Sequence, residues 1–247
     1  MEQQNYNYNS DSVFVQEGSV SKKFFANVFT LMFAALTIST LAAYLFATNE
    51  AFQRYIFLPE SGLTTLGYIA IFSPLAMVLI IGSGALSRLP YIALLVAFIV
   101  FSLVMGISLS FLGAVYTDGS IVSCFGAAGV IFGIMALLGY TTDVDLSKYR
   151  TILLIGVVGL FVTGIINMFI QSEQFSLIRA FIGVAVFTAL TAYDVQMIKR
   201  LGQGIEKDGG VIEDASNKKL AIMAALSLYL DFVNIFLFLL RIFGGRK

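Results

Sequence analysis

Long apolar runs fill most of the chain after residue 24, and each is about as long as a membrane-spanning helix. A helix needs about 20 predominantly apolar residues to cross the hydrocarbon core of a bilayer. Seven runs meet this length, and they cover residues 24–48, 65–86, 91–113, 119–140, 151–171, 175–198 and 220–243. The pattern therefore predicts an all-α integral membrane fold with seven transmembrane helices.

Polar segments rich in turn residues separate the apolar runs. The longest predicted loop, from Leu201 to Lys219, mixes Gly, Lys, Glu and Asp. Residues 1–21 are polar, rich in Asn and Gln, and without apolar periodicity, which predicts a disordered tail. Residues 22–247 then form a single transmembrane domain. Two predicted helices carry glycines spaced for close helix packing, namely Gly126, Gly129 and Gly133, and Gly156, Gly159 and Gly164.

The composition agrees with a membrane protein and narrows its chemistry. The chain is 58% hydrophobic and 12% charged, with a mean hydropathy of +0.89, whereas soluble domains carry about 25% charged residues. Its zero net charge argues against a nucleic-acid partner. The absence of histidine excludes most zinc, haem and transition-metal sites, and it removes the usual sensor of pH near neutrality. The single cysteine, Cys124, has no intrachain disulfide partner. No cofactor and no protein partner is indicated.

The distribution of Lys and Arg predicts the orientation, because cytoplasmic segments of membrane proteins are enriched in these residues. With the N-terminus inside, the inner segments carry Lys22, Lys23, Arg88, Lys148, Arg150, Lys199, Arg200, Lys207, Lys218 and Lys219. The outer segments carry Arg54, Arg179, Arg241, Arg246 and Lys247. This asymmetry favours a cytoplasmic N-terminus and an external C-terminus. A six-span arrangement with a re-entrant last segment, which puts both termini inside, is the alternative.

Only two of the fifteen acidic residues lie deep in apolar runs, Asp194 in the sixth predicted helix and Asp231 in the seventh. A charge at the bilayer centre costs about 2.5–3.5 kcal/mol on insertion scales, so each position needs a reason. One reading is a structural polar pair that fixes helix packing. The favoured reading is an ion or proton site, because intramembrane acids usually mark such pathways.

The two helices are antiparallel, so contact between the two aspartates depends on their heights in the membrane. Asp194 lies about 7–8 Å from the predicted inner end of its helix, and Asp231 lies about 18 Å from that of its own. Contact is compatible with this spacing but is not required by it. Further polar residues share the same faces, Thr191 with Asp194, and Ser227 and Asn234 with Asp231.

If the carboxylates meet, they share a proton, because both cannot ionise cheaply together. Their hard oxygen atoms also suit Ca²⁺ better than a soft metal, so protons and Ca²⁺ would compete for one site. Arg88 lies on an inside turn, on the same side of the membrane as Asp194. An ion pair between Arg88 and Asp194 is therefore geometrically possible. The alternative is that Arg88 is solvated and only helps to set the orientation in the membrane.

Two stretches carry a resemblance to a known family. The segment Ala192-Tyr193-Asp194-Val195-Gln196-Met197-Ile198 resembles the tyrosine–aspartate segment that ends helix six of the Bax-inhibitor-like family, also called the transmembrane Bax inhibitor motif family. The segment from Ala225 to Phe236, with its continuation from Leu239 to Gly244, resembles the last helix of that family. The resemblance is weaker elsewhere and extends from about residue 22 to the end.

The resemblance implies a seven-helix fold in which the last helix lies centrally between two three-helix layers. Bacterial members are described as pH-sensitive calcium leak channels in which two aspartates share a proton, and these positions fall on Asp194 and Asp231. A latch arginine of the family falls on Arg88, by alignment through Gly106-Ile107-Ser108. The family's turn is more basic than Ser87-Arg88-Leu89-Pro90, and its bacterial members have a shorter loop at 201–219. Tyr193, Thr191, Ser227 and Asn234 are expected to support the aspartate pair.

The sequence thus predicts a pH-sensitive calcium leak channel rather than an enzyme, in a bacterial inner membrane, with Ca²⁺, protons and lipid as its partners. A non-conducting interaction or regulatory protein is the alternative that the family name suggests. An intramembrane aspartyl protease would need a Gly-x-Gly-Asp motif where this chain has Leu228-Tyr229-Leu230-Asp231. A retinal protein would need a lysine between Leu220 and Arg241, and none is present.

Overall fold

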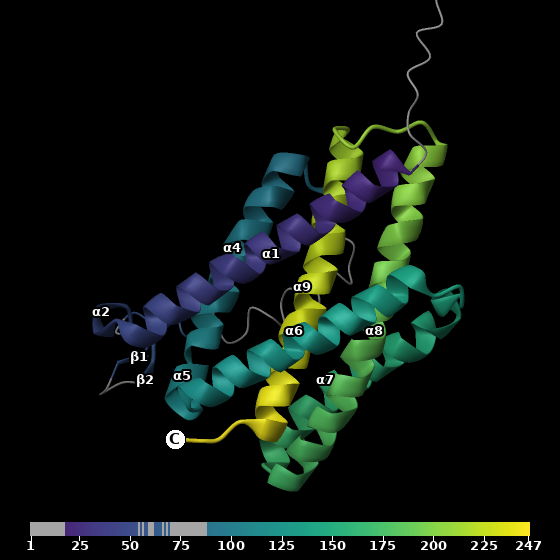
Figure 1. The fold of residues 1–247 in the computed structure, drawn as a ribbon. Helices are drawn as coiled ribbons and strands as arrows, with labels where there is room; N and C mark the ends of the chain where they lie inside the picture. The colour runs from purple at the N-terminus through teal and green to yellow at the C-terminus, as the bar shows by residue number, and fades with distance from the viewer. Residues whose placement is uncertain are drawn as a thin grey trace, which may run out of the picture.

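Six long helices dominate the part of the chain that the computed structural model describes, namely residues 18–53, 55, 57–58, 62–65, 67, 69 and 88–247 (Figure 1). The elements in chain order are α1 (Ser19–Thr48), α2 (Glu50–Gln53), β1 (Phe57–Leu58), β2 (Gly62–Leu63), α4 (Tyr91–Ser110), α5 (Leu112–Val115), α6 (Asp118–Thr141), the 3₁₀ helix η2 (Leu146–Tyr149), α7 (Arg150–Ile170), α8 (Glu173–Lys207) and α9 (Ala215–Phe243). The short strands β1 and β2 pair antiparallel.

The last helix, α9, lies in the centre of the bundle (Figure 1). It packs against α1, α4, α6 and α8. In its most apolar stretch 67% of the residues are buried, against 6% for the span that contains α7. Tyr229, Leu228 and Ile235 on α9 are almost fully buried. The central position expected for the last helix is therefore confirmed for the described helices.

Local signals explain where the long helices begin and end. Pro90 precedes α4, where its missing N–H costs nothing and its fixed φ suits a helix start. Gln171 has a φ of 54°, a left-handed conformation that ends α7. The hydroxyl of the next residue, Ser172, accepts the N–H of Phe175 at 3.2 Å and so caps α8. Two adjacent residues thus make the turn between α7 and α8.

The six described long helices confirm six of the seven predicted spans. The span predicted for 65–86 lies outside the described residues, apart from Thr65, Gly67 and Ile69. The first helix begins at Ser19 rather than at residue 24, because Lys22 and Lys23 occupy its first turns with their side chains exposed. The remainder of the tail predicted over 1–21 lies outside the described residues.

The prediction of a loop from 201 to 219 was wrong. Helix α8 continues to Lys207 and α9 begins at Ala215, so only residues 208–214 connect them. Glu206, Lys207, Lys218 and Lys219 lie on helical turns that extend past the apolar runs. Polarity therefore marked the end of the apolar stretch and not the end of the helix.

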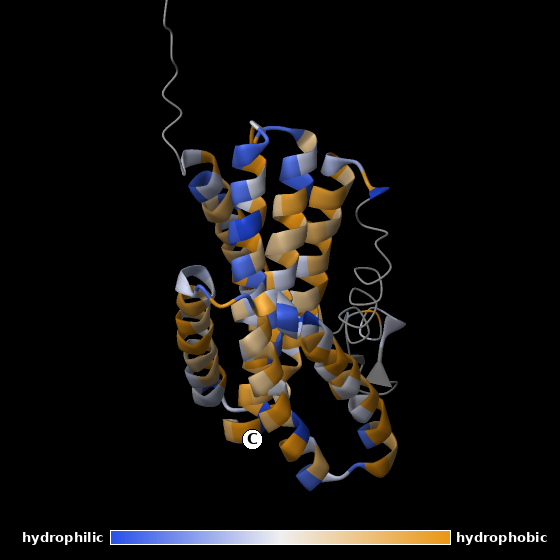
Figure 2. Cartoon of the chain, turned by 90° about the vertical axis from the view of Figure 1, so that its right-hand side faces the viewer, coloured by the Kyte–Doolittle hydropathy of each residue, from blue (hydrophilic) through white to orange (hydrophobic). Residues whose placement is uncertain are grey.

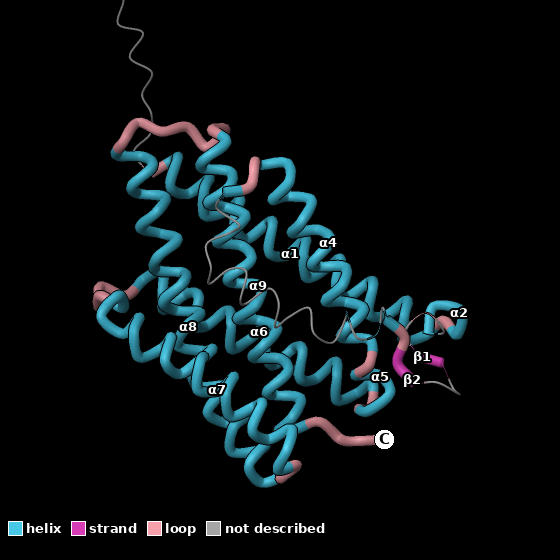
Figure 3. The backbone as a smooth tube through the Cα atoms, turned by 180° about the vertical axis from the view of Figure 1, so that it is seen from behind, coloured by secondary structure: helices cyan, strands magenta, loops and turns pink. Residues whose placement is uncertain are grey.

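The start of α1 and the C-terminal residues lie at opposite ends of the bundle (Figure 3). The start of α1 lies beside the end of α8, where the Gly18 N–H donates to Glu206 Oε1 at 2.6 Å. Helix α4 begins at this end too, since Lys218 lies over the Tyr91 ring at 5.8 Å. The C-terminal residues pair instead with the α5–α6 connection, where the Thr117 N–H donates to the Gly245 carbonyl at 3.0 Å. Helix α9 therefore runs the full length of the bundle, which disfavours a re-entrant last segment.

Hydrophobic residues make up most of each long helix (Figure 2), and many of their large side chains are exposed. Exposed examples on α4, α6 and α7 include Ile92, Val122, Leu137, Ile155 and Phe169. Water does not tolerate so much contiguous apolar surface, whereas lipid does. The chain is a multi-pass membrane protein.

Two of the six glycines predicted at close helix contacts lie at such contacts, since a Cβ at Gly156 would lie 3.1 Å from Val186 of α8 and one at Gly164 would meet Arg179 of α8. A Cβ added at Gly126, Gly129, Gly133 or Gly159 would meet nothing within 4 Å, so these positions do not form a tight seam. A Cβ at Gly106 would clash with the Ser39 carbonyl on α1, and one at Gly139 with the Ala192 carbonyl on α8. Spacing along one helix did not reveal which face meets a neighbouring backbone.

Candidate functional site

Helices α8 and α9 bring Asp194 and Asp231 into one site. Asp194 lies 13 residues before the end of α8 at Lys207, which is about 20 Å along the axis. Asp231 lies 16 residues after the start of α9 at Ala215, which is about 24 Å. Because the two helices are joined by a short connection and run antiparallel, these heights nearly coincide. The longer helices thus remove the height mismatch that the sequence suggested.

The two carboxyl groups occupy different environments. Asp194 is partly buried, and its Oδ2 accepts a hydrogen bond from the Ser227 hydroxyl of α9. Asp231 is only 4% exposed, and its buried Oδ2 has no hydrogen-bond partner among the described residues. Ser227 lies four residues before Asp231 on α9, so its hydrogen bond holds the Asp194 carboxyl about one helical turn from Asp231. The structure therefore brings the predicted pair together and leaves one of its oxygens unsatisfied.

An unsatisfied buried carboxyl oxygen is unfavourable, and a buried charge without a partner is more so. A proton on Asp231 or a cation beside it would relieve this cost. The oxygens assembled here come from two carboxyl groups and the Ser227 hydroxyl. Because Ca²⁺ takes six to eight oxygen ligands, an ion at this position would keep several of its waters. Such a site suits a passing or weakly held ion better than a permanently bound one.

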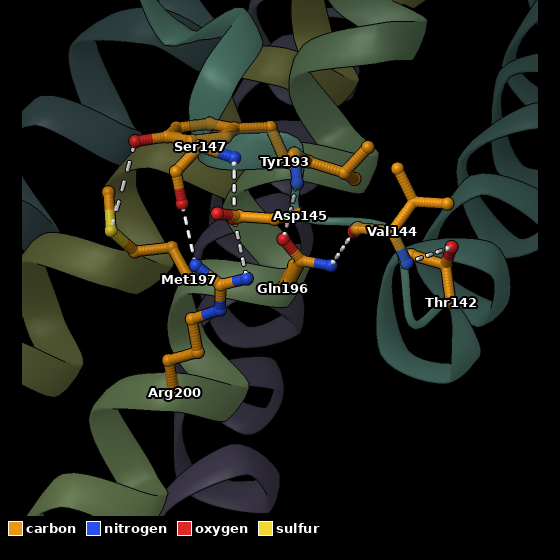
Figure 4. A network of polar contacts seen from close by, with 9 residues as sticks. Thr142, Val144, Asp145, Ser147, Tyr193, Gln196, Met197 and Arg200 are labelled. Carbon is orange, nitrogen blue, oxygen red and sulfur yellow. Dashed lines mark hydrogen bonds and ion pairs between the residues drawn. The ribbon is translucent and has the colours of Figure 1, made fainter.

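The other predicted supporting residues bond within their own helices. Thr191 donates to the Phe187 carbonyl at 2.9 Å, and Asn234 donates to the Leu230 carbonyl at 2.8 Å. The Tyr193 hydroxyl approaches the Met197 sulfur at 3.9 Å (Figure 4). Of the four, only Ser227 forms a hydrogen bond with one of the aspartates.

Arg88 lies just before α4, with an exposed side chain. Within the described part of the chain it takes part in no ion pair, and Asp194 bonds to Ser227 instead. The predicted pair between Arg88 and Asp194 is therefore not formed in this conformation. A latch role for Arg88 stays a prediction about another conformation.

Sequence reasoning missed a polar clamp on α8 that begins two residues after Asp194 (Figure 4). The Gln196 amide accepts the Leu146 N–H at 2.9 Å and donates to the Val144 carbonyl at 2.7 Å. Arg200 donates to Asp145 and to Ser147, both at 2.6 Å. The clamp ties the connection between α6 and α7 to the helix that carries Asp194.

Hydrogen bonds from Ser147, and secondarily from Arg200, lower the pKa of Asp145 to about 2. Asp145 therefore stays ionised at any pH near neutrality, and the clamp is not a sensor in that range. The sequence Asp145-Leu146-Ser147 at a helix start was a usable signal, since aspartate often caps the N–H two residues on.

Sequence reasoning also missed a buried polar contact that joins three helices. The Ser39 hydroxyl on α1 lies 2.6 Å from the Tyr229 hydroxyl on α9 and 2.7 Å from the Ser102 carbonyl on α4. Tyr229 and Asp231 are two residues apart, so they point about 200° apart around α9. This contact fixes one face of α9 while the aspartate pair occupies another.

Comparisons with known proteins agree with this architecture. Residues 21–247 match the family described as inhibitor of apoptosis-promoting Bax1. The chain belongs to this Bax inhibitor-like family. It is 36% identical over 239 residues to the inner membrane protein YbhL of Escherichia coli K12, covering 96% of this chain and 97% of YbhL. It is 36% identical over 233 residues to a protein of Borreliella burgdorferi, covering 94% and 96% of the two chains. A Streptococcus pyogenes serotype M1 membrane protein is 31% identical over 236 residues, covering 96% and 98%.

Proposed function

We propose that this Bax inhibitor-like protein is a pH-sensitive calcium leak channel, gated by the Asp194–Asp231 pair. The observation that carries the proposal is the hydrogen bond to Asp194 from Ser227, one turn before Asp231 on α9, with Asp231 Oδ2 buried and unsatisfied among the described residues. An acidic pair at this depth is costly, and membrane proteins retain such groups mainly for ion or proton pathways.

Proton sharing provides the gate. Two carboxyl groups that interact in a low-dielectric environment cannot both ionise cheaply, so at low pH the pair retains a proton. As the pH rises the proton leaves, and the two like charges either separate or take up a cation. Because α8 and α9 carry one acid each, separation moves the central helix against its neighbour. Ca²⁺ flux should therefore rise with pH.

The membrane and the orientation are also proposed. The name of YbhL, an inner membrane protein, supports a bacterial inner membrane. The excess of Lys and Arg near the start of α1 and the α8–α9 connection supports a cytoplasmic position for that end. Cysteines introduced at Ser216 and Lys247, both exposed, should react with impermeant reagents from opposite faces. Labelling of both from one face would contradict this orientation.

Purified protein in liposomes tests the channel proposal. Wild-type liposomes should take up Ca²⁺ faster than empty ones, and the Asp194→Asn, Asp231→Asn double variant should lose the pH-dependent part of the uptake. Asp145→Asn is the matched control, since it also removes an aspartate that contacts α8 but lies outside the pair. Uptake equal to that of empty liposomes at every pH would favour the non-conducting regulatory alternative.

A further inference from the structure

Three arginines gather at the end of the bundle where α8 begins and α9 ends. They are Arg179 on α8, Arg241 in the last turn of α9 and Arg246 in the C-terminal segment. They contribute three of the five basic residues that the sequence assigns to the outer side, where Lys and Arg are normally sparse. Orientation therefore does not explain their presence.

Arg246 is held in place by the C-terminal segment. The Gly245 N–H donates to the Ser120 hydroxyl at 2.9 Å, and the Lys247 N–H donates to the Val115 carbonyl at 3.1 Å. These bonds anchor the backbone on both sides of Arg246. Its guanidinium then reaches Glu173 at 2.6 Å, at the start of α8. The segment thus presents a positive group over the end of α8.

Arg241 and Arg179 are less well compensated. The Arg241 Nε donates to the Ser176 hydroxyl at 2.8 Å, and Ser176 is itself buried. The Arg179 Nε is buried without a hydrogen-bond partner among the described residues, and its guanidinium lies against Gly164 of α7. The charge of Arg241 acts on Arg179, so two like charges repel in a partly buried environment.

The balance of charge at this position favours an anion. Arg241 and Arg246 lie near one carboxylate, Glu173, and that carboxylate is already paired with Arg246. A pocket of about 340 Å³ opens beside Arg241 and Arg246, and it is lined by Glu173, Gln174, Leu177, Arg241, Gly244 and Arg246. The planar fork of arginine matches phosphate oxygens with two parallel hydrogen bonds.

We propose that Arg241 and Arg246 form a binding site for a phosphate group, carried by an anionic phospholipid headgroup or present as free phosphate, and that Arg179 adds positive charge nearby. The surroundings favour the lipid. Leu177, which lines the pocket, and Ile178 and Phe181 further along α8 are exposed, and they offer an apolar surface for an acyl chain. A bound headgroup would join the start of α8 to the end of α9, the two helices that carry the aspartate pair.

The test uses the full-length protein in a sugar-based detergent, with dihexanoyl phosphatidylglycerol, dihexanoyl phosphatidylcholine or inorganic phosphate added. Phosphatidylglycerol should raise the thermal unfolding midpoint saturably and should remain bound in native mass spectrometry. The Arg241→Gln, Arg246→Gln double variant should weaken this effect about tenfold or more, since it removes both charged hydrogen-bond donors that line the pocket. Arg150→Gln, an exposed arginine at the opposite end of α7, should respond like the wild type.

If the double variant does not fold, Arg246→Gln tests the same site from its exposed rim and should also weaken the response. Stabilisation by phosphatidylglycerol alone identifies the lipid headgroup, and equal, competing stabilisation by inorganic phosphate identifies free phosphate. Equal stabilisation of the wild type by phosphatidylcholine would overturn the proposal. An unchanged response to phosphatidylglycerol in the Arg246→Gln variant would overturn it as well.

Discussion

The Ser227 hydroxyl donates a hydrogen bond to the Asp194 carboxylate, one helical turn before Asp231 on the same helix. This bond stabilises the ionised form of Asp194. Ser227→Ala should therefore make the pair hold its proton to higher pH, and the rise of Ca²⁺ flux should move to higher pH by about one unit or more. Flux measured against pH in liposomes checks this. Thr191→Val is the control and should leave the profile unmoved, because Thr191 bonds to its own helix.

The clamp at Asp145 should affect stability without affecting pH sensing. The pKa of Asp145 is about 2, below its ordinary 3.8, so its contribution to stability is complete above the ordinary value and is lost as the pH falls through about 2. Asp145→Asn should lower the thermal unfolding midpoint by a constant amount across mildly acidic and neutral pH. The shape of the flux profile should not change. A shifted flux profile would instead make the clamp part of the sensor.

Gly139 allows α6 to approach the backbone of α8 at Ala192, two residues before Asp194. Gly139→Ala should lower the free energy of unfolding by about 1–3 kcal/mol or more, since a Cβ there must displace backbone. A Cβ added at Gly129 would meet nothing within 4 Å, so Gly129→Ala should leave the free energy of unfolding unchanged or raise it slightly. The thermal unfolding midpoints of the Gly139→Ala and Gly129→Ala variants in detergent check both expectations. Equal loss of stability in both would mean that the contact at Gly139 is not tight.

The sequence predicted the six described spans and singled out the two acids within them because both leave strong local signals. Apolar runs of membrane length specify helices, and a charge inside such a run, as at Asp194 or Asp231, stands out immediately. Helix ends were harder, because the turns from Leu201 to Lys207 are helical although polar. Contacts between helices were the hardest feature to predict from the sequence. The bonds of Gln196 to the α6–α7 connection, and of Ser39 to Tyr229, join residues 50 to 190 positions apart, and only the packed bundle brings them together.

Arg88 has an exposed side chain and no ion pair with the described residues. If it latches Asp194 in a closed conformation, Arg88→Ala should raise basal Ca²⁺ leak at low pH, where the wild type is least active. Arg150→Ala is the control, since it removes a second exposed arginine. Basal leak and pH dependence identical to the wild type in both variants would leave Arg88 as an orientation signal only.

The central claim is that Asp194 and Asp231 act as one proton-sharing unit. The most direct measurement is Ca²⁺ flux against pH for the wild type, Asp194→Asn, Asp231→Asn and the double variant, reconstituted at equal density. The wild-type flux should rise with pH, and each single variant should lose most of this rise. Because the residues act together, the double variant should lose little more than either single variant. Four superimposed profiles would contradict the account and would make the two aspartates structural.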